Sequence, residues 1–372
     1  MHEPPSRDQD SCLNRQQRLT DWMKEQGIDL VIAVTPENVQ WITGQWCKWL
    51  FRSAAAITAD GKVTLALPDT VAPCARADEL VRYEAQWHST LRNDQSEACC
   101  SALAGALDLP APVVLGVEYS SFPQHLAGKL APQQNADMVD VEPQLYRLRR
   151  RKEADELAAI QVAIGATEKM YERAREIICP GISELEVFNQ LQSAAVEHCG
   201  EMLTGTGNDY QCNSRGGPPR KESVAADGEL YILDLGPAYR GYFADNCRTI
   251  AVTEANSLQQ DAWSRIMDVF QLVEETVRPG SSAADLFRQV EQLLGQAPVG
   301  NFTHHLGHGI GLFPHEAPHL NPFWDDCFEQ GDVFTAEPGL YDPQLAAGMR
   351  IENNYLVTAN GVHKLTNFSM EL

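Results

Sequence analysis

Apolar and polar positions in the first part of the chain predict a mixture of helices and strands. Residues 14–26 place apolar side chains at helical spacing, and the apolar runs at 28–34 and 112–118 are typical of buried strands. The segments AAAIT and KVTLALP flank an Asp-Gly pair at 60–61, which favours a β-hairpin. The mixture predicts an α/β domain over residues 1–147.

The remaining chain, residues 148–372, follows a basic run and opens with a long amphipathic helix. Arginine and lysine crowd positions 147–152, which most simply marks a solvated linker, and a link to a functional site is the alternative. Apolar residues then step by three and four from Leu157 to Ile178, and a Cys-Pro-Gly sequence ends this helix.

Two segments of the second part can be laid over each other without gaps. They are PGISELEVFNQL, which starts at Pro180, and PGSSAADLFRQV, which starts at Pro279. Each contains a serine followed three residues later by an acid, a helix N-cap signature that a generic helix start would partly explain. An acid-bearing apolar strand follows each copy, near Asp234 and near Glu337. We therefore expect a pseudo-twofold domain with its site on the axis.

Composition and charge narrow the class of protein. A net charge of −22 and a pI near 4.8 argue against nucleic acid or an anionic membrane as a partner. No apolar run reaches the roughly 18 residues of a membrane span, and the opening MHEPPSRDQD lacks the apolar core of a signal peptide. Ten cysteines without a CxxC pair favour reduced thiols. These features predict a soluble, cytoplasmic protein.

Candidate chemistry concentrates in NFTHHLGHGIGLFPHE, residues 301–316, and in acids on both sides of it. An acid inside or at the end of an apolar strand is costly unless it is paired or ligated. Four such acids and one imidazole would form an oxygen-rich site for Mn, Co, Fe or Zn. Because four carboxylates carry more charge than one ion usually needs, we expect two ions. The expected ligands are Asp234, Asp245, His308, Glu337 and Glu352.

Several polar residues of these segments also fit plain structural roles. Asp234 and Asp245 could be turn-forming acids. Arg350 could form a plain surface pair with the acid two residues later, or it could hold a ligand carboxylate. We interpret His305 as structural and leave His319 undecided.

The motifs DLGPAYRGYFADNCRT, HHLGHGIGLFPHE, TAEPGLY and MRIENN resemble those of the pita-bread metallopeptidase superfamily, which includes methionine aminopeptidase, prolidase, aminopeptidase P and creatinase. The resemblance covers about residues 150–372, and GIDLVIAVTPENVQWITG in the first part is similar to the creatinase-type accessory domain. Methionine aminopeptidase lacks that domain and creatinase lacks the metal ligands. The resemblance therefore implies a creatinase-like α/β domain, an α+β pita-bread catalytic domain and a homodimer.

The resemblance also implies how the ligands divide between the ions. Asp234 would chelate one ion, and His308 and Glu337 would bind the other. Asp245 and Glu352 would bridge both. Manganese is expected, with cobalt, zinc or iron as alternatives.

The implied reaction is hydrolysis of an Xaa-Pro bond in a short peptide, of the dipeptidase or aminopeptidase P kind. The ions would lower the pKa of a bridging water. Glu337 would carry the proton of that water to the leaving nitrogen. His304 and His315 would contact the substrate and stabilise the tetrahedral intermediate.

Two positions depart from the family pattern. Gly217 stands where family peptidases usually carry a further histidine, and His319 stands where prolidases tend to place an arginine for the carboxylate of a dipeptide. The metal set is thus intact while substrate recognition is altered. A non-peptidase metalloenzyme, acting on a small amide or as a lyase, is one alternative. A binding module without catalysis is the other.

Overall fold

The structure is a computed structural model that describes residues 9–48, 50–109, 112–134, 136–207 and 209–372. Positions 1–8 of the polar opening segment lie outside the described residues. The described chain divides into two compact units. The amino-terminal unit extends to residue 149 and includes 153–155, and the carboxyl-terminal unit comprises 150–152 and 156–372.

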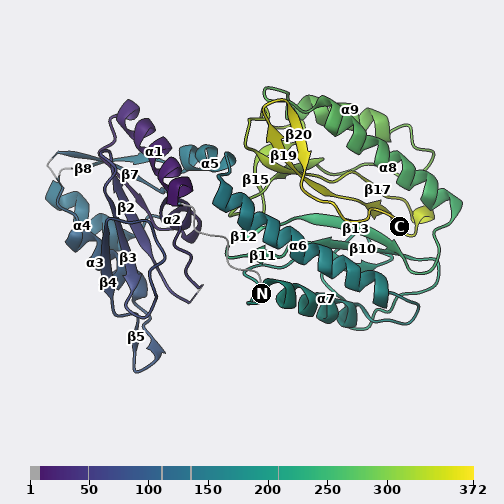
Figure 1. Cartoon of the computed structure of the whole chain (residues 1–372), viewed down its shortest axis with the longest axis horizontal. Helices are drawn as coiled ribbons and strands as arrows, with labels where there is room; N and C mark the ends of the chain where they lie inside the picture. Colours follow the sequence, from purple (N-terminus) through teal and green to yellow (C-terminus); the bar gives the residue numbers. More distant parts are fainter. Residues whose placement is uncertain (1–8, 49, 110–111, 135, 208) are drawn as a thin grey trace. The chain divides into compact units, whose positions relative to one another are not determined.

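The amino-terminal unit is built on a mixed six-stranded sheet of order β4-β3-β2-β1-β7-β8 (Figure 1). Strand β1 pairs antiparallel with β2 and parallel with β7, and all of its residues are buried. Burial on both faces explains why its sequence is a continuous apolar run. Helices α3 and α4 pack on one face of the sheet. The α/β prediction for this part is confirmed. Its elements are α1 (Gln9–Gln26), β1 (Leu30–Ala33), α2 (Pro36–Thr43), β2 (Ala54–Thr58), β3 (Val63–Pro68), β4 (Glu79–Tyr83), β5 (Gln86–Trp87), β6 (Thr90–Leu91), α3 (Gln95–Ala106), β7 (Val113–Val117), α4 (Gln124–Gln134), β8 (Ala136–Asp140) and α5 (Glu142–Arg150).

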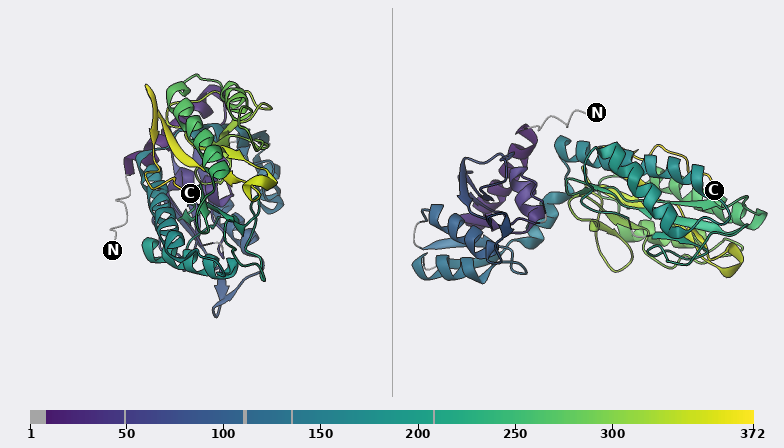
Figure 2. Two further views of the ribbon diagram at one scale, coloured as in Figure 1. Left: turned by 90° about the vertical axis from the view of Figure 1, so that its right-hand side faces the viewer. Right: turned by 90° about the horizontal axis from the view of Figure 1, so that it is seen from below.

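The carboxyl-terminal unit contains two larger sheets with helices on their outer sides (Figure 2), besides the two-stranded sheets β11-β12 and β17-β18. One sheet has the order β13-β10-β9 and the other the order β15-β14-β16-β19-β20. An apolar core lies between the first sheet and helices α6 and α7, and a second core lies between the other sheet and helices α8 and α9. The elements are α6 (Ala154–Ile177), α7 (Glu184–Cys199), β9 (Asp209–Cys212), β10 (Leu230–Leu235), β11 (Ala238–Tyr239), β12 (Tyr242–Phe243), β13 (Asn246–Ala251), α8 (Ser257–Thr276), α9 (Ala283–Leu294), β14 (Gly307–Gly309), β15 (Glu316–Leu320), β16 (Val333–Ala336), β17 (Gly339–Leu340), η1 (Pro343–Leu345), β18 (Met349–Arg350), β19 (Asn353–Thr358) and β20 (Gly361–Lys364).

The predicted repeat is confirmed by the caps of two helices. The Ser183 hydroxyl accepts from the Glu186 backbone N–H at the start of α7, at 3.1 Å. The Ser282 hydroxyl accepts from the Asp285 backbone N–H at the start of α9, at 3.2 Å. Each helix is followed by an antiparallel hairpin, β10–β13 in one copy and β16–β19 in the other. The pseudo-twofold organisation therefore extends from the caps to the strands.

The two halves meet where their hairpins run side by side. The Glu352 backbone N–H donates to the Cys247 carbonyl at 2.9 Å, and the Thr249 hydroxyl donates to the Arg350 carbonyl at 3.0 Å. The Asn354 side chain donates to the carbonyl of Asp245. These contacts bring the acid-bearing ends of both hairpins together. Among the described helices, none combines the length and the apolar content that crossing a membrane requires.

The prediction of a solvated linker at residues 147–152 is wrong. Helix α5 continues through most of this run, and Arg150 and Lys152 are buried. Arg150 pairs with Asp332 at 2.7 Å, and Lys152 Nζ lies 2.8 Å from Glu316 Oε2. Arg150 and Lys152 are therefore structural parts of the carboxyl-terminal unit, and Lys152 holds Glu316, the residue next to His315.

Candidate functional site

The residues that the sequence singled out line one cavity of about 400 Å³ in the carboxyl-terminal unit. A concave site with convergent polar groups is the usual form of a binding site. Seven predicted residues contribute to it: Asp234, Asp245, His304, His308, His315, Glu337 and Glu352. The structure thus gathers side chains from distant parts of the chain, and their role as ligands or catalysts stays a prediction.

The hairpins explain why the carboxylates converge. In the first hairpin, Asp234 lies on β10 opposite Cys247, and Asp245 directly precedes β13. In the second, Glu337 directly follows β16 and Glu352 directly precedes β19, and these two strand ends are paired. The strand position of Asp234 argues against the alternative of a turn-forming acid. Each hairpin therefore delivers two carboxylates to the junction of the sheets.

Glycine is required on both sides of His308. A Cβ atom at Gly307 would lie 2.1 Å from the Thr335 carbonyl oxygen, and one at Gly309 would lie 2.1 Å from the Ala317 carbonyl oxygen. Strand β14 is thus pressed between β15 and β16, where only bare backbone fits. This close approach buries His308 and places its Nε2 3.7 Å from Asp245 Oδ2 and 3.6 Å from Glu337 Oε1.

The donor set fits a divalent cation. Ligand atoms of Asp245, His308 and Glu352 all lie within 4.8 Å of one another. Glu352 is 1% exposed, and its Oε2 has no hydrogen-bond partner among the described residues. Burial, reinforced by the neighbouring carboxylates, raises the pKa of Asp245 and of Glu352 well above the usual range. Oxygen-rich donors with one imidazole suit a hard or borderline ion, which would offset this crowded negative charge.

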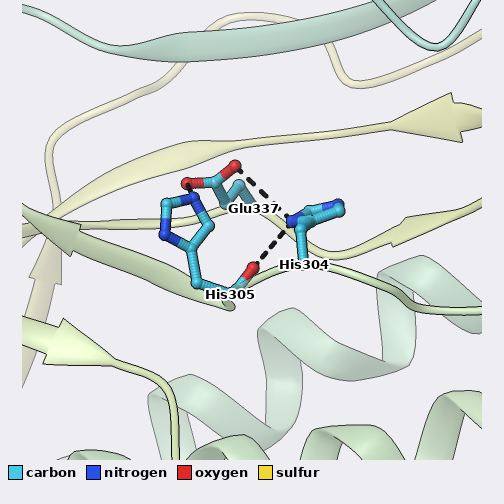
Figure 3. Close-up of side chains that lie close together, drawn as sticks. All are labelled: His304, His305 and Glu337. Atoms are coloured by element: carbon cyan, nitrogen blue, oxygen red, sulfur yellow. Dashed lines mark hydrogen bonds and ion pairs between the residues drawn. The ribbon is translucent and has the colours of Figure 1, made fainter. Parts of the chain in front are cut away.

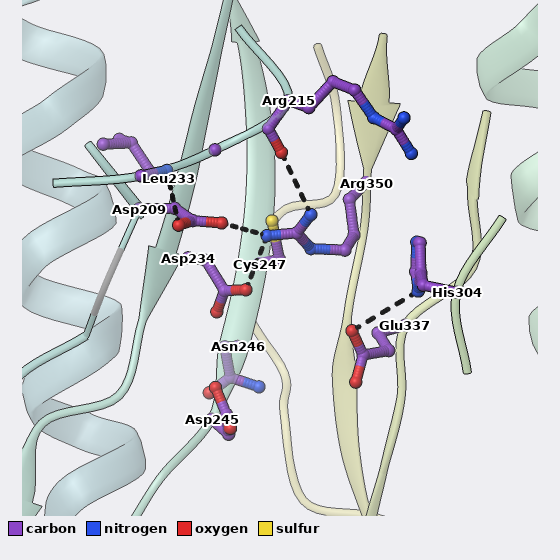
Figure 4. Close-up of polar contacts among 12 residues, drawn as sticks. Asp209, Arg215, Leu233, Asp234, Asp245, Asn246, Cys247, His304, Glu337 and Arg350 are labelled. Atoms are coloured by element: carbon purple, nitrogen blue, oxygen red, sulfur yellow. Dashed lines mark hydrogen bonds and ion pairs between the residues drawn. The ribbon is translucent and has the colours of Figure 1, made fainter. Parts of the chain in front are cut away.

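Arg350 holds Asp234, another of the predicted ligand acids (Figure 4). Its guanidinium donates to Asp234 Oδ2 at 2.7 Å, contacts Asp209 and donates to the Tyr341 hydroxyl at 2.9 Å. Burial still raises the pKa of Asp234 to about 6, because desolvation outweighs the attraction of Arg350. The arginine is itself buried, so the alternative of a surface pair with Glu352 does not apply.

His304, His305 and Glu337 form a second cluster beside the first (Figure 3). His304 Nδ1 donates to the His305 carbonyl at 2.7 Å, so that in the neutral ring Nε2 accepts from the Tyr341 hydroxyl at 3.0 Å. His305 Nε2 lies 3.1 Å from Glu337 Oε1. Burial lowers the pKa of His304 to about 4. Burial opposes ionisation of Glu337, but the contact with His305 and the neighbouring imidazoles outweigh it and lower the pKa of Glu337 to about 2.

His315 is placed differently from His304. Its ring stacks on the ring of His308, with centroids 3.7 Å apart and planes 15° apart. Burial lowers the pKa of His315, so the ring is neutral near pH 7. Within the described chain its ring nitrogens form no hydrogen bond. A neutral imidazole is thus open to the cavity.

The two departures from the family pattern have structural reasons. Gly217 has φ +128°, its N–H donates to Asp209 Oδ1 at 2.6 Å, and a Cβ atom there would lie 2.8 Å from Gln211 Nε2. A histidine at this position would be strained. His319 lies opposite His308 on the neighbouring strand, but its Nδ1 is 2.8 Å from Asp326 Oδ2 and its ring stacks on Trp324, outside the residues that line the cavity.

Four further residues lie at or beside the candidate site, although the sequence predicts no role in it for them: Asp209, Arg215, His305 and Tyr341. His305, which the sequence suggests is structural, lines the cavity and contacts Glu337. Tyr341 ends the TAEPGLY motif, so its proximity to Glu337 in the chain was a usable signal. Asp209 and Arg215 precede the first hairpin without a local pattern that marks them.

Comparison with known proteins adds a family context. A model of metallopeptidase family M24 matches residues 158–359, and a model of the creatinase/prolidase N-terminal domain matches residues 15–151. An Xaa-Pro dipeptidase of Pyrococcus horikoshii is 28% identical over 364 residues, which are 95% of this chain and 97% of that protein.

Solved structures share the whole fold. The prolidase from Pyrococcus horikoshii superposes with a TM-score of 0.78 at 25% identity, over 96% of this chain and 99% of that one. An X-Pro aminopeptidase from Thermotoga maritima has the same TM-score at 20% identity, over 96% and 99%. Both structures therefore share the two-unit fold of this chain.

Proposed function

The chain belongs to metallopeptidase family M24, and from this premise we propose that it hydrolyses the bond before proline in short peptides with two bound divalent ions. The observation that carries the proposal is the convergence of Asp245, His308 and Glu352, whose ligand atoms lie within 4.8 Å of one another. The dipeptidase named among its relatives supports peptide hydrolysis over a small-amide hydrolase or a lyase.

Five residues would hold the ions. Asp234 would serve one, His308 and Glu337 the other, and Asp245 and Glu352 would be shared. The chemistry that such a pair supplies when bound is polarisation of the scissile carbonyl and activation of water. Two observations support this assignment: Glu352 Oε2 has no hydrogen-bond partner among the described residues, and burial raises the pKa of Asp245. A bound cation would stabilise both carboxylates in their ionised form.

The other side chains of the cavity would move protons and orient the substrate. Glu337 has a lowered pKa and is ionised near pH 7, so a carboxylate oxygen accepts the proton of the attacking water and passes it to the leaving nitrogen. His315, neutral and open to the cavity, donates an N–H to the developing oxyanion. His304, whose ring is oriented by Tyr341 and the His305 carbonyl, contacts the substrate from another side.

An assay of proline peptides tests the proposal. Protein loaded with manganese should release alanine from Ala-Pro and from Ala-Pro-Ala, and Ala-Ala should react poorly. The Asp245→Asn variant should lose this activity, whereas Asp268→Asn, which alters an exposed pair on α8, should retain it. Failure to cleave any Xaa-Pro peptide with ions bound would reject the proposal.

Further details belong to the same proposal. We assign residues 1–147 to an accessory domain and residues 148–372 to the catalytic domain. Manganese is the proposed resident ion, and the protein is proposed to act as a cytoplasmic homodimer. Ten free cysteines support a reducing compartment. Metal analysis and sedimentation of the purified protein test the ion and the dimer.

A further inference from the structure

We propose that Arg215 binds the carboxylate of a dipeptide substrate and so makes the enzyme selective for peptides that end with the residue after the scissile bond. This inference rests on the proposed function. It concerns a cation that reaches the cavity from the loop between β9 and β10.

The backbone and side chain of Arg215 are both held beside the cavity. Its carbonyl accepts from Arg350 Nη1 at 3.4 Å. Its guanidinium carbon lies 4.4 Å from the centroid of the Tyr341 ring, and its Nη2 donates to the Thr303 hydroxyl. In the view of Figure 4, the side chain extends toward the side of Arg350 on which His304 lies. Arg215 thus lines the cavity itself and lies over Tyr341, which also lines it.

Arg215 is a solvent-exposed cation that lines the cavity, so its charge is accessible to a ligand. The four predicted ligand carboxylates would be offset by two divalent ions, and the pair of Arg350 with Asp209 is already made. Arg215 has no carboxylate within ion-pair distance in the part of the chain that the structure describes. A guanidinium forms two parallel hydrogen bonds with a carboxylate, which a stacked and oriented arginine favours further. The carboxylate of a short substrate would pair with this exposed guanidinium.

The position that the sequence suggested for this task is already occupied. His319 contacts Asp326 with its Nδ1, at 2.8 Å, and with its backbone N–H, also at 2.8 Å. Its ring stacks on Trp324 at 4.7 Å. Because His319 is paired with an acid and does not line the cavity, Arg215 is the better candidate for an anionic group of the substrate.

Matched substrates isolate this contact. Ala-Pro and Ala-Pro-amide contain the same scissile bond, and only the first carries the carboxylate. With manganese-loaded wild-type protein, kcat/KM should be about 10- to 100-fold higher for Ala-Pro, the range of a charge-assisted hydrogen-bonded pair. Arg215→Met should lose that preference through KM and leave the amide nearly unaffected. Arg215→Lys should keep part of it, and Arg288→Met on the exposed side of α9 should keep all of it.

A binding measurement separates this inference from the proposed function. Calorimetry should show that manganese-loaded wild-type protein binds L-proline about 10-fold or more tightly than prolinamide, and that Arg215→Met removes the difference. If the wild type cleaves both peptides equally and Arg215→Met changes neither reaction nor binding, the inference is overturned while the proposed function stands. If no peptide is cleaved, the proposed function fails, and equal binding of the two ligands would also overturn the role of Arg215.

Discussion

Replacing Arg350 with methionine tests the network that joins the two hairpins. The guanidinium donates to Asp234 at 2.7 Å, contacts Asp209 and donates to the Tyr341 hydroxyl at 2.9 Å, and only 8% of the residue is exposed. Methionine is of similar length and makes none of these polar contacts. Removing one partner of a buried ion pair costs roughly 3–5 kcal/mol, because the remaining carboxylates stay buried without a counter-charge.

We therefore expect metal-free Arg350→Met protein to lose roughly 3–5 kcal/mol of unfolding free energy, measured by urea unfolding with circular dichroism and tryptophan fluorescence. Arg350→Lys keeps the charge without the forked geometry and should lose less. The control Arg288→Met, at an exposed pair, should stay within about 0.5 kcal/mol of the wild type. A loss below about 1 kcal/mol for Arg350→Met would refute the reasoning.

Three further predictions concern titration, packing and a buried pair. Burial raises the pKa of Asp234 to about 6, so the folded metal-free protein favours the protonated carboxyl, and this stabilisation is complete below pH 4 and is lost as pH rises through 6. The free energy of unfolding, measured with urea and compared with Asp234→Asn, should therefore fall by about 2–3 kcal/mol from pH 4 to pH 7. A difference between the two proteins that does not change with pH would contradict this. Gly307→Ala should lower the free energy of unfolding by roughly 2 kcal/mol or more, because the added Cβ meets the Thr335 carbonyl at 2.1 Å; an unchanged melting temperature would be inconsistent with that contact. Lys152→Met should remove the cation that pairs with buried Glu316 and speed hydrogen exchange in the adjoining segment, whereas unchanged exchange would mean that the pair does not hold it.

The fold and the gathering of the acids were accessible from the sequence because their signals are local. Each serine cap, at Ser183 and at Ser282, is defined by residues within four positions of one another. The apolar strand segments around Asp234 and Glu337 make each acid recognisable from its immediate neighbours in the sequence. Two such units in one chain predict a pseudo-twofold domain. The structure then needs only the pairing of neighbouring strands to bring the acids together.

The contacts that were missed depend on residues far apart in the chain. The sequence around the basic run suggests a solvated segment because Asp332, the acid that pairs with Arg150, follows far downstream. Likewise, nothing near Asp209 indicates that Arg350 will reach it. The contact of His305 with Glu337 likewise joins residues that are far apart in the chain. Pairs of charged residues that lie far apart in the chain therefore cannot be predicted from local sequence patterns.

The number of ions per chain tests the central claim most directly. Protein purified without chelator and dialysed against manganese can be analysed by atomic absorption, with anomalous scattering from crystals to locate the ions. We expect about two ions per chain between Asp234, Asp245, His308, Glu337 and Glu352, and a loss of ions in Asp245→Asn. Protein that binds no manganese in the cavity, or binds it equally well without the Asp245 carboxylate, would contradict a two-metal site.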